Sequence, residues 1–386
     1  MLLTNFYKGL EIHRDGKFIA VKFLTPHRVI STCRINGGIR DDLDMIFNHQ
    51  VCEPVNHFSD LQELAVSDPV AYFKKICSAY KFSEKSASLG TAANMNCASI
   101  RKMKFRDLGV LAICTAGVEV NAGRAGDPAT IFETGGRFES IDGSKAEKIG
   151  TINIIVCINK PLARGAMVRS VVTATEAKTA ALWELNINSK YSTGLATGTG
   201  TDQVAVASKL TGEQPLTGAG KHTKLGELIG RTVKEAVKEA LHLQSKLTPQ
   251  NQRSIIVHLG RFGADSEVIV NGVTKHLDKQ KGRLFENNFA GVDRDPVVVA
   301  AVAALVHLWD KICWGILPET CLPEILATYG AQLAAATAGN YERIAFYRKR
   351  LSEHQFIFSN ESLIELICRS IAMGYEEKWK FEGSEQ

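Results

Sequence analysis

The sequence lacks the cysteine and histidine spacings that usually hold a structural metal ion. Its nine cysteines include no CxxC pair, and no HxH, HxxxH or HExxH spacing ties two histidines to one helix face. The odd cysteine count and the apolar runs around several cysteines argue against a disulfide framework. We therefore expect free thiols in a reducing cytoplasm and no zinc site.

Long runs of one charge and a long apolar segment are also missing. The 46 basic and 41 acidic residues give a net charge of +5, and they are spread along the chain, which does not suggest nucleic-acid binding. The polar start shows no signal-peptide core, and we expect the longest apolar run, residues 297–309, to be too short to span a bilayer. The sequence therefore predicts a cytoplasmic protein without membrane contact.

Two nucleotide-binding motifs are incomplete. The run GAGKHT resembles a phosphate-binding loop, but Pro215 stands where the leading glycine should be, and His222 follows Lys221. The run ATGTGTD has Gln203 where a dinucleotide-binding motif needs its third glycine. A phosphoryl-transfer enzyme is therefore the weaker alternative.

Strand and helix signals alternate in the first two thirds of the chain. Runs rich in β-branched residues predict strands, and Asp68 before Pro69 predicts a capped helix start. Apolar residues spaced by three and four predict two longer helices, the first starting near Gly165. The expected strands are 17–24, 28–35, 107–117 and 150–159, and the expected helices are 68–80, 166–185 and 225–241.

A polar, proline-containing stretch at residues 244–253 predicts a domain boundary. Beyond it, residues 253–263 and 266–273 suggest two short strands, and the remainder is helical from Asp295 onward. The expected fold class is α+β, with a mixed β-sheet and flanking helices in residues 1–250 and a mostly helical region in residues 251–386.

Chemistry-bearing residues concentrate between residues 191 and 230. Three glycines, Gly194, Gly198 and Gly200, allow the backbone to turn and to expose N–H groups. The same stretch supplies threonine hydroxyls and the carboxylate of Asp202. We expect a helix to begin near Lys221, with His222 in its first turn, where a neutral imidazole can act as a base.

Four strings, in this order and spacing, resemble the adenosylcobinamide amidohydrolase family of corrinoid salvage: GTINIIVCINKPL, GAMVRSVVTATEAKTAALWEL, YSTGLATGTGTD and GKHTKLGELIG. The similarity extends more weakly upstream, through STCRINGGIRDDLDMIFNHQV and TAGVEVNAGRAGDP, so that it covers roughly residues 18–243. It implies hydrolysis of the amide that joins aminopropanol to a propionate side chain of the corrin ring, giving adenosylcobyric acid. The corrinoid is then the substrate, and no separate organic cofactor is implied. Lys160 and Arg164 are departures that make one turn more basic than in the family.

Amide hydrolysis needs an activated nucleophile, oxyanion donors and an acid for the leaving amine. The candidate catalytic residues are His222, Asp202, Glu176 and Thr199, and the candidate substrate-binding residues are Asn121, Asp127, Thr197, Thr201, Lys178 and Lys221. Each also has a structural explanation as a helix cap, a turn residue or a solvated helix-face charge. Asn36, Asn48 and His49 form a second upstream group, in which a structural histidine is the favoured interpretation.

Several alternatives stay open at this point. A threonine nucleophile at the new amino terminus of a cleaved chain is one, and a divalent metal held by Asp202, His222, Asp127 and Glu176 is another. A non-catalytic corrinoid-binding protein would need the same pocket without the chemistry. We also expect residues 251–386 either to cover the corrin site or to mediate self-association as a homo-oligomer.

Overall fold

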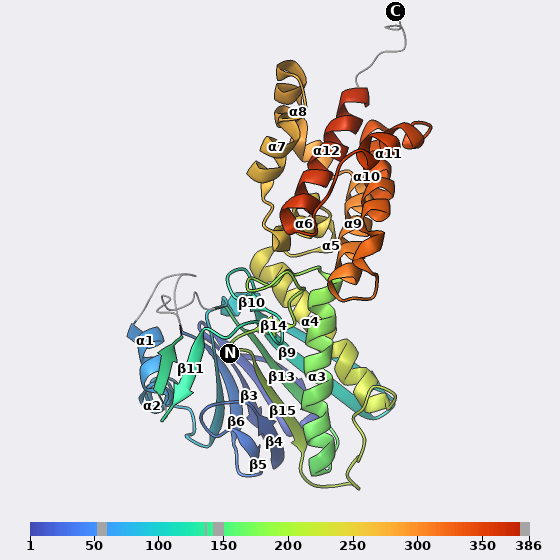
Figure 1. Ribbon diagram of the computed structural model, residues 1–386. Coiled ribbons are helices and arrows are strands. Elements are labelled where there is room, and N and C mark those ends of the chain that lie inside the picture. Colours follow the sequence, from blue (N-terminus) through green and yellow to red (C-terminus); the bar gives the residue numbers. More distant parts are fainter. Residues whose placement is uncertain (52–59, 136, 142–149, 379–386) are drawn as a thin grey trace, which may run out of the picture. The chain divides into compact units, whose positions relative to one another are not determined.

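The computed structural model describes residues 1–51, 60–135, 137–141 and 150–378 (Figure 1). The chain divides into two compact units, Met1–Thr248 and Pro249–Gln386. The first unit combines sheets with flanking helices, and the second is helical, which confirms the predicted fold class.

Two large sheets form the N-terminal unit, where the sequence suggested one. The five-stranded sheet has the order β1-β2-β3-β6-β7, with strands Leu2–Phe6, Leu10–Asp15, Phe18–Phe23, Met45–Gln50 and Ser86–Thr91. The six-stranded sheet has the order β5-β4-β15-β13-β9-β8, with strands Gly38–Arg40, His27–Ser31, Gln203–Lys209, Ile152–Ile158, Leu108–Ala116 and Ser99–Phe105. Most neighbours are antiparallel, while β6–β7 and β13–β15 are parallel.

The two sheets pack face to face between two layers of helices (Figure 1). Alternation along β13 shows the arrangement, because Ile155 joins the core between the sheets while Ile154 faces the helices. Helices α3 (Arg164–Glu184) and α4 (Lys224–Ser245) cover the outer face of the six-stranded sheet. Helices α1 (Asp60–Ser67) and α2 (Pro69–Tyr80) cover the outer face of the five-stranded sheet. The unit is therefore a four-layer sandwich, helix–sheet–sheet–helix.

The predicted capped start of α2 is confirmed, because the Asp68 side chain accepts a hydrogen bond from the Ala71 N–H. The apolar positions expected on α4 are buried, from Leu225 to Leu241. Its start was placed wrongly, however. Helix α4 begins at Lys224, because the Thr223 side chain caps the Gly226 N–H, so His222 lies before the cap and not in the first turn.

Two small ladders complete the unit. Strand β10 (Ala122–Gly123) pairs with β14 (Gly198–Thr199), and β11 (Ile131–Thr134) pairs with β12 (Arg137–Ser140). The β10–β14 pair brings the loop that follows β9 beside the glycine- and threonine-rich loop.

The C-terminal unit packs its helices around a core of its own. They are α5 (Pro249–Gln252), α6 (Ile255–Leu259), α7 (Ser266–Thr274), α8 (Lys279–Asp293), α9 (Pro296–Cys313), α10 (Leu322–Ala338), α11 (Ile344–Ser352) and α12 (Asn360–Lys378). The two strands expected at residues 253–263 and 266–273 are wrong, since α6 and α7 occupy these segments. Ser254 and Asp265 cap them by accepting from Val257 and Val268 N–H groups.

Helix α9 is long and apolar enough to cross a membrane by length and composition. The expectation that this apolar run is too short is therefore wrong, because the helix begins at Pro296 and continues to Cys313. Its side chains Val302, Leu305 and Trp309 lie in the core of the helical unit. In this structure one face of α9 thus packs into the core of that unit.

Candidate active site

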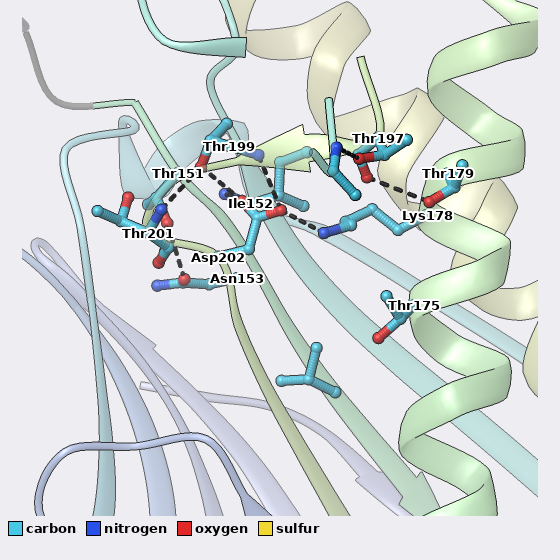
Figure 2. Close-up of polar contacts among 12 residues, drawn as sticks. Thr151, Ile152, Asn153, Thr175, Lys178, Thr179, Thr197, Thr199, Thr201 and Asp202 are labelled. Carbon is cyan, nitrogen blue, oxygen red and sulfur yellow. Dashed lines mark hydrogen bonds and ion pairs between the residues drawn. The ribbon is translucent and has the colours of Figure 1, made fainter. Parts of the chain in front are cut away.

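A buried ion pair lies where α3 meets the glycine- and threonine-rich loop. Lys178 of α3 donates through Nζ to Oδ2 of Asp202, which precedes β15 (Figure 2). Only 8% of the Lys178 side chain and 10% of the Asp202 side chain are exposed. Buried charges of this kind are costly unless they are paired and hydrogen-bonded, so the surroundings of Asp202 decide whether the pair is stable.

Asp202 receives three further hydrogen bonds. Its Oδ1 accepts from the Thr199 hydroxyl at 2.6 Å and from the Ile152 N–H at 2.9 Å, and its Oδ2 accepts from the Thr199 N–H at 3.0 Å (Figure 2). Thr199 itself is partly exposed. The hydroxyl of a partly exposed residue is thus bonded to a carboxylate that is nearly removed from solvent.

The glycine at position 198 is required by this geometry and not by its backbone dihedrals. Gly194 lies in a bend and Gly200 in a turn, as expected, although none of Gly194, Gly198 and Gly200 adopts a positive φ. A Cβ at position 198 would overlap with Oδ2 of Asp202 and with Nζ of Lys178. At position 200 a Cβ would meet open space.

The upstream loop predicted from Asn121 and Asp127 lies beside this site. The Thr197 hydroxyl accepts from the Ala125 N–H at 2.9 Å. Asn121 and Thr201 converge on one carbonyl, because the side chains of both donate to the Gly150 oxygen, at 2.6 and 2.9 Å. The loop at residues 121–127 and the threonine loop are therefore one structural element, built from two distant segments.

Asp127 closes that loop on itself. Burial alone would raise the pKa of its carboxyl, but hydrogen bonds from Ser189, Ser192 and the Arg124 N–H lower the pKa below its ordinary value. The carboxylate is thus an anchor for the loop, which is the structural interpretation that the sequence left open.

A chain of buried amides links the site to the second sheet. Asn153 of β13 donates to the Asn48 side chain at 2.9 Å, and Asn48 of β6 donates to the Thr115 hydroxyl at 2.8 Å. The Thr151 hydroxyl reaches both the Asn153 side chain, at 3.3 Å, and the Thr201 carbonyl, at 2.8 Å (Figure 2). The end of the threonine loop is therefore held from both sheets.

Glu176, Lys221 and His222 lie apart from this network. Lys221 pairs with Glu176 at 3.0 Å, and both side chains are largely exposed. His222 is exposed in the turn before α4, and within the described residues it makes no hydrogen bond or ion pair. The structure thus brings Asp202, Lys178 and Thr199 together but does not bring His222 or Glu176 into contact with them.

The remaining polar candidates have structural partners. His49 is buried and bonds the Tyr72 hydroxyl at 2.7 Å, and burial lowers its pKa to about 4. Asn36, at φ 54°, donates to backbone carbonyls of the segment that leads into β7. Lys160 is paired with Asp107 and Glu213. Among the described residues, no group of three or more His, Cys, Asp and Glu side chains is arranged to hold a metal ion.

Sequence reasoning missed the residues that support the site. Asn153 and Thr151 were read as part of a strand and were not singled out. The polar Asn153 between the apolar residues Ile152 and Ile154 was the available signal, because a buried strand seldom places an amide there without a partner. Arg124 was also missed, and no local pattern marks it.

Chemically, the arrangement offers a hydroxyl, a carboxylate that accepts its hydrogen bond, and a cation that compensates that carboxylate. The Thr201 N–H lies 3.4 Å from the Thr199 hydroxyl oxygen and adds a backbone donor beside it. These are the parts that a nucleophilic hydroxyl with a general base requires.

Comparison with known families and proteins covers the N-terminal unit. The family model described as adenosylcobinamide amidohydrolase matches residues 3–249. An uncharacterized protein of Methanocaldococcus jannaschii is 35% identical over 242 residues, which make up 60% of this chain and 89% of that protein. An adenosylcobinamide amidohydrolase of Methanosarcina mazei is 30% identical over 224 residues, which make up 55% of this chain and 89% of that protein.

Proposed function

Since the chain belongs to the adenosylcobinamide amidohydrolase family, we propose that it hydrolyses the amide joining aminopropanol to the corrin side chain of adenosylcobinamide. The products are adenosylcobyric acid and aminopropanol, and the reaction serves corrinoid salvage in the cytoplasm. The name of the Methanosarcina mazei relative supports this assignment. The corrinoid is the substrate, and the proposal includes no resident metal or organic cofactor.

One observation assigns the proposed reaction to particular residues. Thr199 is partly exposed, and its hydroxyl donates at 2.6 Å to Asp202, whose charge is compensated by the buried Lys178. A carboxylate within hydrogen-bond distance of a hydroxyl has the geometry that a general base requires. We therefore assign the chemistry to this group and not to the exposed turn that carries His222.

In the first step Thr199 attacks the amide carbonyl carbon of the substrate. A bond forms between its hydroxyl oxygen and that carbon, and the hydroxyl proton passes to Asp202. The Thr201 N–H stabilises the negative oxygen of the tetrahedral intermediate. The carbon–nitrogen bond then breaks, Asp202 returns the proton to the nitrogen, and aminopropanol leaves from an ester of Thr199.

Water completes the reaction in a second step. Asp202 takes a proton from the water as its oxygen attacks the ester carbonyl carbon. The bond to Thr199 breaks, the proton returns to the threonine oxygen, and the corrinoid carboxylic acid is released. Lys178 holds Oδ2 of Asp202 throughout, so that Oδ1 faces the hydroxyl.

The test is product analysis by mass spectrometry of purified protein incubated with adenosylcobinamide. Wild-type protein is expected to release aminopropanol and adenosylcobyric acid, with and without a chelator. Thr199→Val and Asp202→Asn are expected to lower turnover at least about a hundredfold, since each removes one partner of the proton transfer. Thr175→Val is the matched control, because Thr175 is exposed on α3 and, among the residues that the structure describes, its hydroxyl bonds only the Val171 carbonyl.

Other outcomes would change the assigned nucleophile, the metal requirement or the proposed function itself. Normal turnover in Thr199→Val would make water the nucleophile, and loss of turnover with chelator would require a metal. A catalytic role for His222 stays a prediction, and the variant His222→Ala tests it. A sharp loss of turnover in a folded variant would place the imidazole in the mechanism. Bound corrinoid without released aminopropanol would leave a non-catalytic corrinoid-binding protein.

A further inference from the structure

A half-exposed tryptophan stands on α3 one turn beyond the site. Trp183 is 47% exposed and follows Thr179 by four residues, so the two side chains share a helix face. The Thr179 hydroxyl donates to the Thr197 carbonyl at 3.1 Å, which ties this face to the threonine loop (Figure 2). A large aromatic ring left open beside a candidate active site is typical of a binding surface.

Arg124 holds the tryptophan ring from the neighbouring loop. Its guanidinium carbon lies 5.8 Å from the centroid of the Trp183 ring, and its Nη1 donates to the Leu195 carbonyl at 3.3 Å. Its backbone N–H donates to Asp127 at 2.7 Å. A Cβ at Gly194 would come within 2.5 Å of the Arg124 Cδ, so the loop packs directly on the arginine stem. The pair is therefore fixed in position and not two loose surface side chains.

The backbone connects this pair to the reacting groups. Ala125, which follows Arg124, donates to the Thr197 hydroxyl at 2.9 Å, and Thr197 is two residues from Thr199. The ring of Tyr191 lies 3.4 Å from the position that a Cβ of Gly123 would occupy, which adds a second aromatic group to the same rim. Indole, guanidinium and phenol thus gather around the loop that carries the nucleophile.

We propose that Trp183 and Arg124 form the binding platform for the corrin macrocycle, an assignment that rests on the proposed function. The indole covers the apolar face of the large ring. The guanidinium, which has N–H groups beyond the one bonded to Leu195, donates to carbonyl oxygens at the ring periphery. Both residues bind substrate and take no part in proton transfer.

The C-terminal unit contains a matched control. Trp314 is 53% exposed and has the Lys311 ammonium 4.6 Å from its ring centroid, so it too is an open indole beside a cation. It lies outside the residues that match the family model. If any exposed indole bound corrinoids, Trp314 would do so as well.

The experiment compares full-length wild type with Trp183→Ala, Trp183→Phe and Trp314→Ala. Steady-state kinetics with adenosylcobinamide give KM and kcat, and quenching of tryptophan fluorescence by cobinamide gives Kd. We expect Trp183→Ala to raise KM and Kd at least tenfold with kcat within about threefold, because the ring contributes only to binding. Trp183→Phe restores most of the affinity, and Trp314→Ala leaves both constants unchanged.

Equal KM and Kd in Trp183→Ala and Trp314→Ala would overturn the platform. Failure of the proposed function is recognised separately, because wild-type protein would then release no aminopropanol. If cobinamide still quenches wild type and Trp183→Ala binds it at least tenfold more weakly, the platform stands as a corrinoid site without chemistry. If wild type does not bind cobinamide at all, both proposals fall. Since Trp183 is half exposed, melting temperatures close to that of wild type are expected for both Trp183 variants.

Discussion

At the scale of single residues, Lys178 and Asp202 form a nearly buried ion pair in the N-terminal unit. Two charges removed from water lose hydration that their mutual attraction only partly restores, and well-packed apolar residues would be as stable or more so. Three hydrogen bonds, two from Thr199 and one from Ile152, also reach the Asp202 carboxylate and offset part of its lost hydration energy. Stability alone does not explain such a pair, whereas the proposed role of Asp202 as the base for the Thr199 hydroxyl would explain it.

The titration of His49 is expected to make the unfolding free energy of the protein depend on pH. Burial, with a smaller effect of the charge of Lys17, lowers its pKa from 6.5 to about 4 in the folded protein. Between these values the unfolded chain binds the proton and the folded chain does not, so falling pH favours unfolding. We expect this residue to remove on the order of 2 kcal/mol of unfolding free energy between pH 7 and pH 5.

His49→Gln removes the titrating group, and urea denaturation at the two pH values measures the result. The unfolding free energy of the variant should decline less between pH 7 and pH 5 than that of wild type. The comparison uses the two declines, so a general loss of stability in the variant does not affect it. Equal declines would show that His49 titrates normally in the folded protein.

At the scale of elements, the sequence predicted correctly those helix features that depend on residues close together in the chain. The cap of α2 and the apolar face of α4 follow from residues a few positions apart. Helices α6 and α7 were mistaken for strands because the runs IIV and VIV have high β-propensity. The caps at Ser254 and Asp265, together with packing in the helical core, outweigh that propensity.

Pairing between elements could not be predicted in the same way. The threonine loop was identified from its composition, but the bond between Lys178 and Asp202 joins a helix to a loop residue 24 positions further along. The link from Asn153 to Asn48 spans 105 residues and two sheets. Such contacts depend on strand order and on which face of a sheet each side chain occupies, and no periodicity in the sequence records either.

The loop that carries β14 offers a paired test of this geometry. Gly198→Ala places a methyl group where Oδ2 of Asp202 and Nζ of Lys178 now lie, so the ion pair must shift and turnover should fall at least about a hundredfold. Gly200→Ala, two residues away, adds a methyl group in open space and should keep turnover within about threefold. Aminopropanol release measures both variants, and equal activities would show that the buried pair is not part of the reaction.

At the scale of the whole molecule, each unit has a core of its own. Three apolar clusters lie within the first 248 residues, and a fourth lies entirely among residues 255–375. The family match ends at residue 249, and Thr199, Asp202 and Lys178 all come from the first unit. The proposed active site and the helical region therefore belong to separately packed parts of the chain.

A chain that stops after Gln250 tests what the helical unit contributes. Because the four-layer sandwich keeps its three apolar clusters, we expect the shortened protein to unfold cooperatively and to release aminopropanol with kcat/KM within about threefold of the full chain. Light scattering on both proteins gives their subunit numbers, and a smaller number in the shortened chain would assign self-association to the helical unit. A folded but inactive shortened protein would contradict the prediction, since residues beyond 250 would then have to contribute to the site.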